Sequence, residues 1–250
     1  MSAGRDFPNW MRKLHQAVVL DAEGIPGLTR SVYIGRMESC AGFKAGCGSP
    51  YCPACSTRIF YGLRQRLMGV ASRIPARDLR FGTFTVADCS DMELRANLKF
   101  VTECARTMLK GIPSLRGWFI RKEVSRTLRA GYYHPHLHVL MHVTPGYSSG
   151  RNTMSRAKWR EAWTCAIPEE LQVQGRPDYE PADVQNVTNV EGIVKYVTKS
   201  PWHNASGTRI EESINDAIEI DAALFAIAGM RRYSCFGTLT LPPRGRRRRE

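Results

Sequence analysis

The sequence predicts a mixed α+β protein, and two observations carry that prediction. Short runs of alternating or β-branched apolar residues, typical of strands, are interspersed with longer segments whose apolar residues recur at the helical period. Two of the strand-like runs are separated by a short connection that contains a glycine, which favours an antiparallel hairpin. The chain has 250 residues, 43% of them hydrophobic, which is enough for one large domain with a packed core.

The predicted hairpin joins residues 117–125 to residues 136–143. A turn centred between positions 129 and 130 would place Glu123 directly opposite His136. Residues that pair directly across antiparallel strands share a face, and so do residues two apart along one strand. Glu123, His136 and His138 are therefore expected on one patch of the sheet.

This patch is a candidate metal site. Two imidazoles and a carboxylate can converge on one divalent ion and leave open positions for a substrate. The alternative is a histidine-rich strand surface that holds no ion. His134 and His142 lie in phase with the same face, so either is a candidate additional ligand.

A second metal site is predicted upstream, where four cysteines fall within sixteen residues. The spacing of the last two is that of a chelating half-site, and four thiolates would hold zinc in a closed, tetrahedral knuckle. No apolar signal core precedes them, and such crowding without a secretion signal favours metal over disulfides. An iron–sulfur cluster and free cysteines are the alternatives. The four candidate zinc ligands are Cys40, Cys47, Cys52 and Cys55.

Helices and two further strands are expected on both sides of the hairpin. Residues 91–111 show the clearest helical period, with a glycine and then a proline at the end. In a helix over 153–166, Trp159 and Trp163 share a face and are expected in the core rather than as stacking platforms for bases. The remaining predictions are helices at 57–71, 189–199 and 212–228 and strands at 79–86 and 183–187.

The chain is strongly basic, with a formal net charge of +13. The last seven residues include five arginines and one glutamate, so the rest of the chain keeps +9. Distributed positive charge predicts a polyanionic partner, most simply nucleic acid. No run of about 18 apolar residues occurs, so no membrane span is expected. The basic residues expected to contact DNA are Arg121, Lys122, Lys195, Arg231 and Arg232.

Tyr196 is a candidate nucleophile. It lies three residues before Lys199 in the predicted helix 189–199, so the two side chains would share a helical face. Nearby positive charge would favour the phenolate, which in an unperturbed tyrosine forms with a pKa of about 10. The alternative is a half-buried tyrosine flanked by solvated lysines, and the spacing alone does not decide between them.

Three segments, taken in order, resemble the three motifs of rolling-circle replication initiators. They are Phe-Gly-Thr-Phe-Thr-Val at 81–86, His-Pro-His-Leu-His-Val-Leu at 134–140 and Lys-Tyr-Val-Thr-Lys at 195–199. More narrowly, the chain resembles plasmid Rep proteins of the pC194/pUB110 type, a branch of the HUH endonuclease superfamily. The resemblance covers residues 40–240, and both the cysteine-rich segment and residues 231–237 fit it.

The resemblance implies a fold and a domain plan. The fold would be a central antiparallel sheet flanked by helices, of the ferredoxin-like or palm type found in HUH endonucleases. Residues 76–240 would form this endonuclease domain, preceded at 1–75 by a region that carries the zinc knuckle at 40–55. Residues 241–250 would form a basic, disordered tail.

The resemblance also implies a mechanism. His136, His138 and Glu123 would hold Mg²⁺ or Mn²⁺ at the scissile phosphate of origin DNA, presented as a single strand or a hairpin. Tyr196 would attack the phosphorus, which forms a 5′-phosphotyrosine link and releases a 3′-OH primer. Lys199 would position the phosphate or stabilise its charge.

One departure from the family concerns the cleavage that ends a round of replication. In this family a glutamate four residues before the tyrosine is thought to activate water. Here that position is Gly192, and Glu191 lies one residue earlier, a shift that turns a helical side chain by about 100°. Glu191 could take this role if the helix starts late. Tyr179 or a second copy of the protein could instead take part.

Other classes of protein would share part of this pattern. A transposase or relaxase of the same superfamily would use the same chemistry, whereas a zinc-stapled nucleic-acid-binding protein or a zinc hydrolase would not need Tyr196. No nucleotide-binding P-loop motif occurs, so a host helicase and polymerase are expected partners. We expect a cytoplasmic protein of a prokaryotic host. Its oligomeric state is not predicted, and a dimer is one option.

Overall fold

The computed structural model describes residues 53–127, 131–147, 153–173, 180–199 and 230–243. The chain divides into two compact units, Met1–Gly62 with Lys199–Ala228 and Leu63–Thr198 with Gly229–Glu250. In the first unit, the described residues are the first part of helix α3 and Lys199. Everything that forms the candidate site lies in the second unit.

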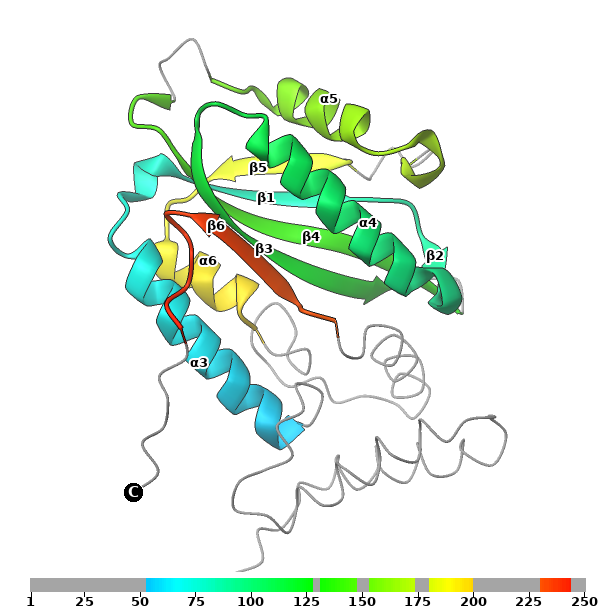
Figure 1. The fold of residues 1–250 in the computed structure, drawn as a ribbon, viewed down its shortest axis with the longest axis horizontal. Helices are drawn as coiled ribbons and strands as arrows, with labels where there is room; N and C mark the ends of the chain where they lie inside the picture. Colours follow the sequence, from blue (N-terminus) through cyan, green and yellow to red (C-terminus); the bar gives the residue numbers. More distant parts are fainter. Residues whose placement is uncertain (1–52, 128–130, 148–152, 174–179, 200–229, 244–250) are drawn as a thin grey trace, which may run out of the picture. The chain divides into compact units, whose positions relative to one another are not determined.

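An antiparallel sheet is the centre of the second unit, as Figure 1 shows. Its strands follow the order β5-β1-β4-β3-β6, and the short β2 pairs with the start of β4. The sheet and its flanking helices agree with the predicted α+β class. The strands are β1 (Leu79–Thr85), β2 (Cys89–Ser90), β3 (Leu115–Arg126), β4 (Tyr132–Val143), β5 (Ala182–Asn186) and β6 (Tyr233–Gly237).

The β3–β4 hairpin has the predicted register, because Glu123 pairs directly with His136. β4 begins at Tyr132, four residues earlier than expected. The early start has a physical cause, since β2 pairs with Tyr132 and Tyr133 and thereby extends the ladder of β4. β4 is the second unit's central strand, with β1 on one side and β3 on the other.

Helices α4 (Asp91–Lys110) and α5 (Arg156–Ala166) cover one face of this sheet (Figure 1). Ser90 and Glu93 form a capping box at the start of α4, and Gly111 follows its end. Trp159 and Trp163 are buried in the core, as predicted, and the Trp163 indole donates a hydrogen bond to a backbone oxygen of β1. The core on this face includes Phe84, Val101, Ala105, Trp118, Ile120, Leu137, Val139, Met141 and Val184.

The opposite face carries the histidines and is covered in part by α6 (Val190–Val197). Asn189 caps this helix by accepting a hydrogen bond from the backbone N–H of Gly192 at 2.9 Å. The helix was predicted to reach Lys199, but it ends two residues earlier. Thr198 adopts φ −114° and ψ 13°, which departs from helical geometry, so the helix does not continue past Val197.

The last part of α3 (Pro53–Ala71) joins the same face. Arg66 donates hydrogen bonds to the Tyr233 hydroxyl and to the Pro242 carbonyl, each at 3.1 Å. Arg64 lies 3.5 Å from the Thr198 hydroxyl, just after α6. These contacts tie the second half of α3 to β6 and to the end of the helix that bears Tyr196.

Several sequence predictions fall outside the described residues. They are the zinc ligands Cys40, Cys47 and Cys52, Tyr179, the helix at 212–228 and most of the tail at 241–250. Cys55 lies near the start of α3, and the position of its side chain is outside the description. The zinc knuckle therefore stays a prediction. Within the described ranges, no helix combines the length and the hydropathy that crossing a membrane requires.

The alternation of β4 can be tested at Leu137, which lies between the two central histidines but points into the opposite, helix-covered core. We expect Leu137→Ala to lower the free energy of unfolding by about 2–5 kcal/mol, because it leaves a cavity in that core. Urea unfolding would measure this change. Met92→Ala, at a site 87% exposed on α4, should change it by less than about 0.5 kcal/mol. Equal changes in the free energy of unfolding at the two positions would contradict the assignment of Leu137 to the helix-covered face of the sheet.

Candidate functional site

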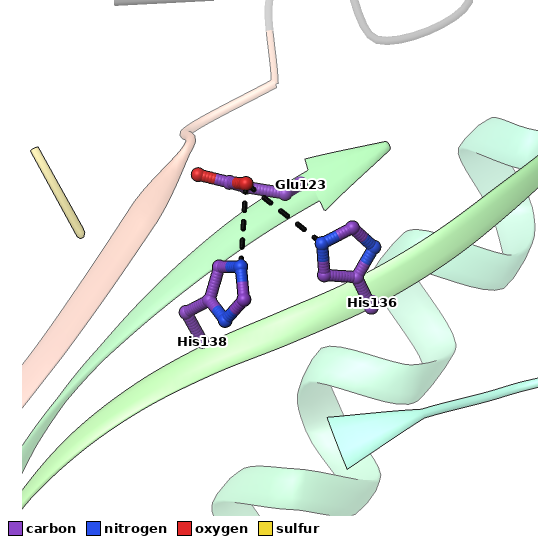
Figure 2. A group of neighbouring side chains, drawn as sticks. All are labelled: Glu123, His136 and His138. Atoms are coloured by element: carbon purple, nitrogen blue, oxygen red, sulfur yellow. Dashed lines mark ion pairs between the residues drawn. The ribbon is translucent and has the colours of Figure 1, made fainter. Parts of the chain in front are cut away.

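Glu123 of β3 and two histidines of β4 converge at one point of the sheet, as Figure 2 shows. The Glu123 Oε2 atom lies 3.3 Å from His138 Nε2 and 3.8 Å from His136 Nε2. One potential ligand atom from each residue lies within 4.8 Å of the other two. Two imidazoles and one carboxylate are donors that a divalent cation accepts, so this acid–histidine cluster fits the predicted ligand set.

Each ring of the cluster is oriented through its second nitrogen. His136 Nδ1 lies 3.2 Å from the backbone oxygen of His134, and His138 Nδ1 lies 3.1 Å from the Thr83 hydroxyl. Such outer contacts fix the orientation of an imidazole and direct its other nitrogen toward a metal. In both rings it is Nε2 that faces the carboxylate of Glu123.

Glu123 is nearly enclosed, yet it stays ionised. Burial by itself would raise its pKa, but the neighbouring imidazoles of His136 and His138 and the charge of Arg121 together lower the pKa well below its usual range. Arg121 Nε lies 3.9 Å from Glu123 Oε1, and its side chain is 2% exposed. The cluster therefore presents a carboxylate, the form that binds a cation.

Tyr196 of α6 points at this cluster. Its hydroxyl lies 3.3 Å from His138 Nε2, and its ring meets the imidazole edge-on with centroids 4.9 Å apart. Phe81 of β1 packs against both rings, stacked on His138 at 5.5 Å and edge-on to Tyr196 at 5.7 Å. Tyr196 of α6 and Phe81 of the neighbouring strand β1 thus meet at the ring of His138.

The expectation that lysines lower the pKa of Tyr196 is wrong in this structure. Burial and, second, the charge of Glu123 raise the pKa above its usual value. Lys195 instead forms an ion pair with Glu191 at 2.6 Å along the exposed side of α6. Lys199 lies beyond the end of the helix, so it does not share a helical face with Tyr196.

His134 and His142, the candidate additional ligands, are directed elsewhere. His134 Nδ1 lies 2.8 Å from Asp88 Oδ1, and His142 Nδ1 lies 2.8 Å from the Thr238 hydroxyl. Among the residues that the structure describes, neither belongs to the acid–histidine cluster. Their phase on β4 was predicted correctly. His134 stacks on His136 and lines the same cavity, whereas His142 lies near the far end of the strand.

The residues predicted to contact DNA occupy different environments. Arg121 is buried beside Glu123, and Lys122 lies half-buried on the opposite face, where burial lowers its pKa and Glu103 of α4 is a neighbouring charge. Arg231 is exposed and lies over the ring of Tyr233, 5.4 Å from its centroid, whereas the Arg232 carbonyl accepts a hydrogen bond from Lys122 N–H.

A cavity of about 460 Å³ opens beside the cluster and Tyr196. Its walls include residues that the sequence did not single out, among them Ser125, Glu180 and Asp183. Asp183 belongs to β5 and pairs with Thr83 of β1. Ser125 follows from the hairpin register, since it lies two residues after Glu123 on β3 and pairs with His134. No local signal could have placed Glu180 and Asp183 here, because they come from a loop and a strand that are distant in sequence.

The antiparallel sheet, the acid–histidine cluster and the tyrosine beside it together agree with the class that the three motifs predict, the rolling-circle replication initiators. Comparison with known proteins tests this class independently. The chain matches the sequence profile of a family described as replication protein over residues 43–234. No solved structure matches it significantly.

Curated relatives agree with the family match. "Protein rep" of Streptococcus pneumoniae serotype 2 is 28% identical over 169 residues, which cover 62% of this chain and 50% of that protein. "Protein rep" of a Bacillus species and that of Bacillus amyloliquefaciens are each 25% identical over 202 residues, covering 72% of this chain and 65% and 59% of theirs. The chain thus spans about half to two thirds of the length of these relatives.

This chain belongs to the replication protein family, and its resemblance to plasmid rolling-circle initiators is confirmed.

The cluster predicts a measurable cation site. We expect the full-length protein to bind Mn²⁺, and Glu123→Gln to weaken that binding by more than about tenfold, because loss of a ligand should exceed the usual cost of losing an outer contact. Electron paramagnetic resonance of free Mn²⁺ would measure the affinity. His134→Asn is the control, with an expected change below about threefold. An equal loss in the two variants would mean that His134 is a ligand after all.

Proposed function

We propose that this replication protein nicks and rejoins one strand of origin DNA through Tyr196. The observation that carries the proposal is the position of the Tyr196 hydroxyl, 3.3 Å from an imidazole nitrogen that itself lies 3.3 Å from the Glu123 carboxylate. A nucleophile beside a candidate cation site is the arrangement that phosphoryl transfer requires. Family membership and the similarity to proteins named rep support the same function.

Glu123, His136 and His138 would hold Mg²⁺ or Mn²⁺. When bound there, the cation would supply positive charge next to the scissile phosphate and stabilise charge that develops on the leaving 3′ oxygen. The ionised carboxylate of Glu123 and the two Nε2 atoms fit this role because all three donors face one point. The choice between the two metals is open, since both accept nitrogen and carboxylate ligands.

Tyr196 would supply the nucleophilic oxygen. Its phenolic oxygen forms a bond to phosphorus while the bond from phosphorus to the 3′ oxygen breaks, which leaves a 5′-phosphotyrosine link and a free 3′-OH. The phenol gives up its proton and the departing 3′ oxygen gains one. The covalent link conserves the energy of the broken bond, so the reverse attack by a 3′-OH can rejoin the strand.

The substrate would be single-stranded DNA or a hairpin at the origin, because the scissile phosphate has to enter the cavity beside Tyr196. Lys195, Lys199, Arg231, Arg232 and Lys122 are proposed phosphate contacts, of which Lys122 lies on the face of the sheet opposite the cavity, and buried Arg121 would act through its charge. Glu191 remains the proposed residue for the terminating cleavage. A host helicase and polymerase are proposed partners, and the cytoplasm of a prokaryotic host is the proposed location.

The chemistry is tested by covalent capture. Full-length protein is mixed with end-labelled single-stranded oligonucleotides that tile its own replicon, in the presence of Mn²⁺ or EDTA, and resolved by denaturing electrophoresis. We expect a Mn²⁺-dependent adduct that survives SDS and carries the label from the 5′-phosphate side of the nick. Tyr196→Phe should abolish the adduct while DNA affinity stays within about twofold.

Tyr147→Phe is the matched control, since it removes the same kind of hydroxyl from a residue beyond the end of β4, where that hydroxyl contacts the backbone of Met154. This variant should keep the adduct. Salt-sensitive binding with no adduct for any oligonucleotide would instead favour a nucleic-acid-binding protein without cleavage. Excision of element ends, without replication of an origin plasmid, would favour a transposase.

A further inference from the structure

The first of the three sequence motifs lies in β1, where Thr83 faces the acid–histidine cluster. Thr83 pairs directly with His138 across the β1–β4 ladder, so the two side chains share a face. The Thr83 hydroxyl lies 3.1 Å from His138 Nδ1, which is hydrogen-bonding distance. The proposed chemistry has so far given no role to this residue.

The two histidines of the cluster are oriented in different ways. His136 Nδ1 contacts a backbone oxygen, that of His134, which no substitution can remove. His138 Nδ1 contacts a side-chain hydroxyl on a neighbouring strand. The orientation of His138 therefore depends on the identity of residue 83, whereas that of His136 depends on the backbone of β4.

His138 is also the ring that both halves of the site share. Its Nε2 lies 3.3 Å from the Glu123 carboxylate and 3.3 Å from the Tyr196 hydroxyl. A rotation of this imidazole would change both distances at once. Phe81, two residues before Thr83 on the same face of β1, limits such rotation because it stacks on the imidazole with an interplanar angle of 27°.

We infer that Thr83 is a positioning residue, which holds the His138 ring so that Nε2 faces Glu123 and Tyr196 together. An Nδ1–H donated to the Thr83 hydroxyl leaves the lone pair of Nε2 directed into the cluster. Threonine suits the position because it is β-branched, as strands prefer, and still carries a hydroxyl. Phe81 acts with it from the flat side of the ring. This inference rests on the proposed cation site and nucleophile.

The inference is tested with three full-length variants, measuring Mn²⁺ affinity by electron paramagnetic resonance and the rate of adduct formation with single-stranded DNA. Thr83→Val keeps the shape and the branching but removes the hydroxyl. Thr83→Ser keeps the hydroxyl. Thr85→Val is the matched control for cation affinity, since Thr85 lies on the same face of β1 opposite His136, whose Nδ1 contacts a backbone oxygen.

We expect Thr83→Val to weaken Mn²⁺ binding about tenfold and to slow adduct formation at saturating Mn²⁺, because the ring shared with Tyr196 is no longer held. Thr83→Ser should stay within about threefold of the wild type in both measurements. Thr85→Val should keep wild-type Mn²⁺ affinity. If Thr83→Val does not fold, comparison of Thr83→Ala with Thr83→Ser asks the same question.

Wild-type Mn²⁺ affinity and adduct rate in Thr83→Val would overturn the inference and leave the proposed function standing. An equal loss in Thr83→Ser would also overturn it, because the hydroxyl would then not be the feature that matters. Absence of Mn²⁺ binding in the wild type would overturn the proposed cation site and the inference together. The two failures are therefore distinguishable.

Discussion

The direct pairing of Glu123 with His136 is the constraint on which the rest of the site depends. Because side chains alternate along a strand, this one register decides that Glu123, His136 and His138 share a face and that Leu137 enters the core on the other. A slip of β3 by one residue would turn the carboxylate toward the apolar residues under α4 and α5, whereas a slip of β4 would direct Leu137 outward and the two histidines inward. The packed core on the helix-covered face thus holds the cluster in register. The same strand, β4, therefore contributes both to the stability of the protein and to the candidate site.

The negative charge of Glu123 is compensated by the groups that surround it in the site. The carboxylate of Glu123 is buried between two imidazoles and the guanidinium of Arg121, and its pKa stays low despite burial. The same carboxylate raises the pKa of Tyr196, after burial itself. A cation held by the cluster would offset that negative charge, so the donor set that binds the metal and the environment of the nucleophile are one system. Lysines on α6 are not part of it, since Lys195 is paired with Glu191 on the exposed side.

The β3–β4 hairpin and the acid–histidine cluster could be predicted from local sequence. The connection between β3 and β4 is short and symmetric, so the turn centre alone predicts that Glu123 faces His136. Contacts between strands or loops that are distant in sequence could not be predicted in this way. His134 was in phase with the ligands, but Asp88 contacts its ring, and nothing near His134 in sequence indicates that partner. The contact between Thr83 and His138 likewise depends on the pairing of β1 with β4, which strand patterns do not specify. The helix bearing Tyr196 was placed correctly at its start, where a cap residue is readable, and wrongly at its end.

The start of α6 also bears on the departure at Gly192. Asn189 caps the helix by accepting from the Gly192 N–H, and a Cβ at position 192 would approach that asparagine side chain to 3.1 Å. A side chain at this position would require the asparagine to shift by a few tenths of an ångström. In this chain the carboxylate is that of Glu191, one residue earlier. At that position the side chain is exposed and paired with Lys195 rather than directed toward Tyr196. For Glu191 to act in a second cleavage, it would first have to leave that ion pair. Glu180 and Asp183 line the cavity beside the tyrosine, and they too are ion-paired, with Arg160 and Arg156.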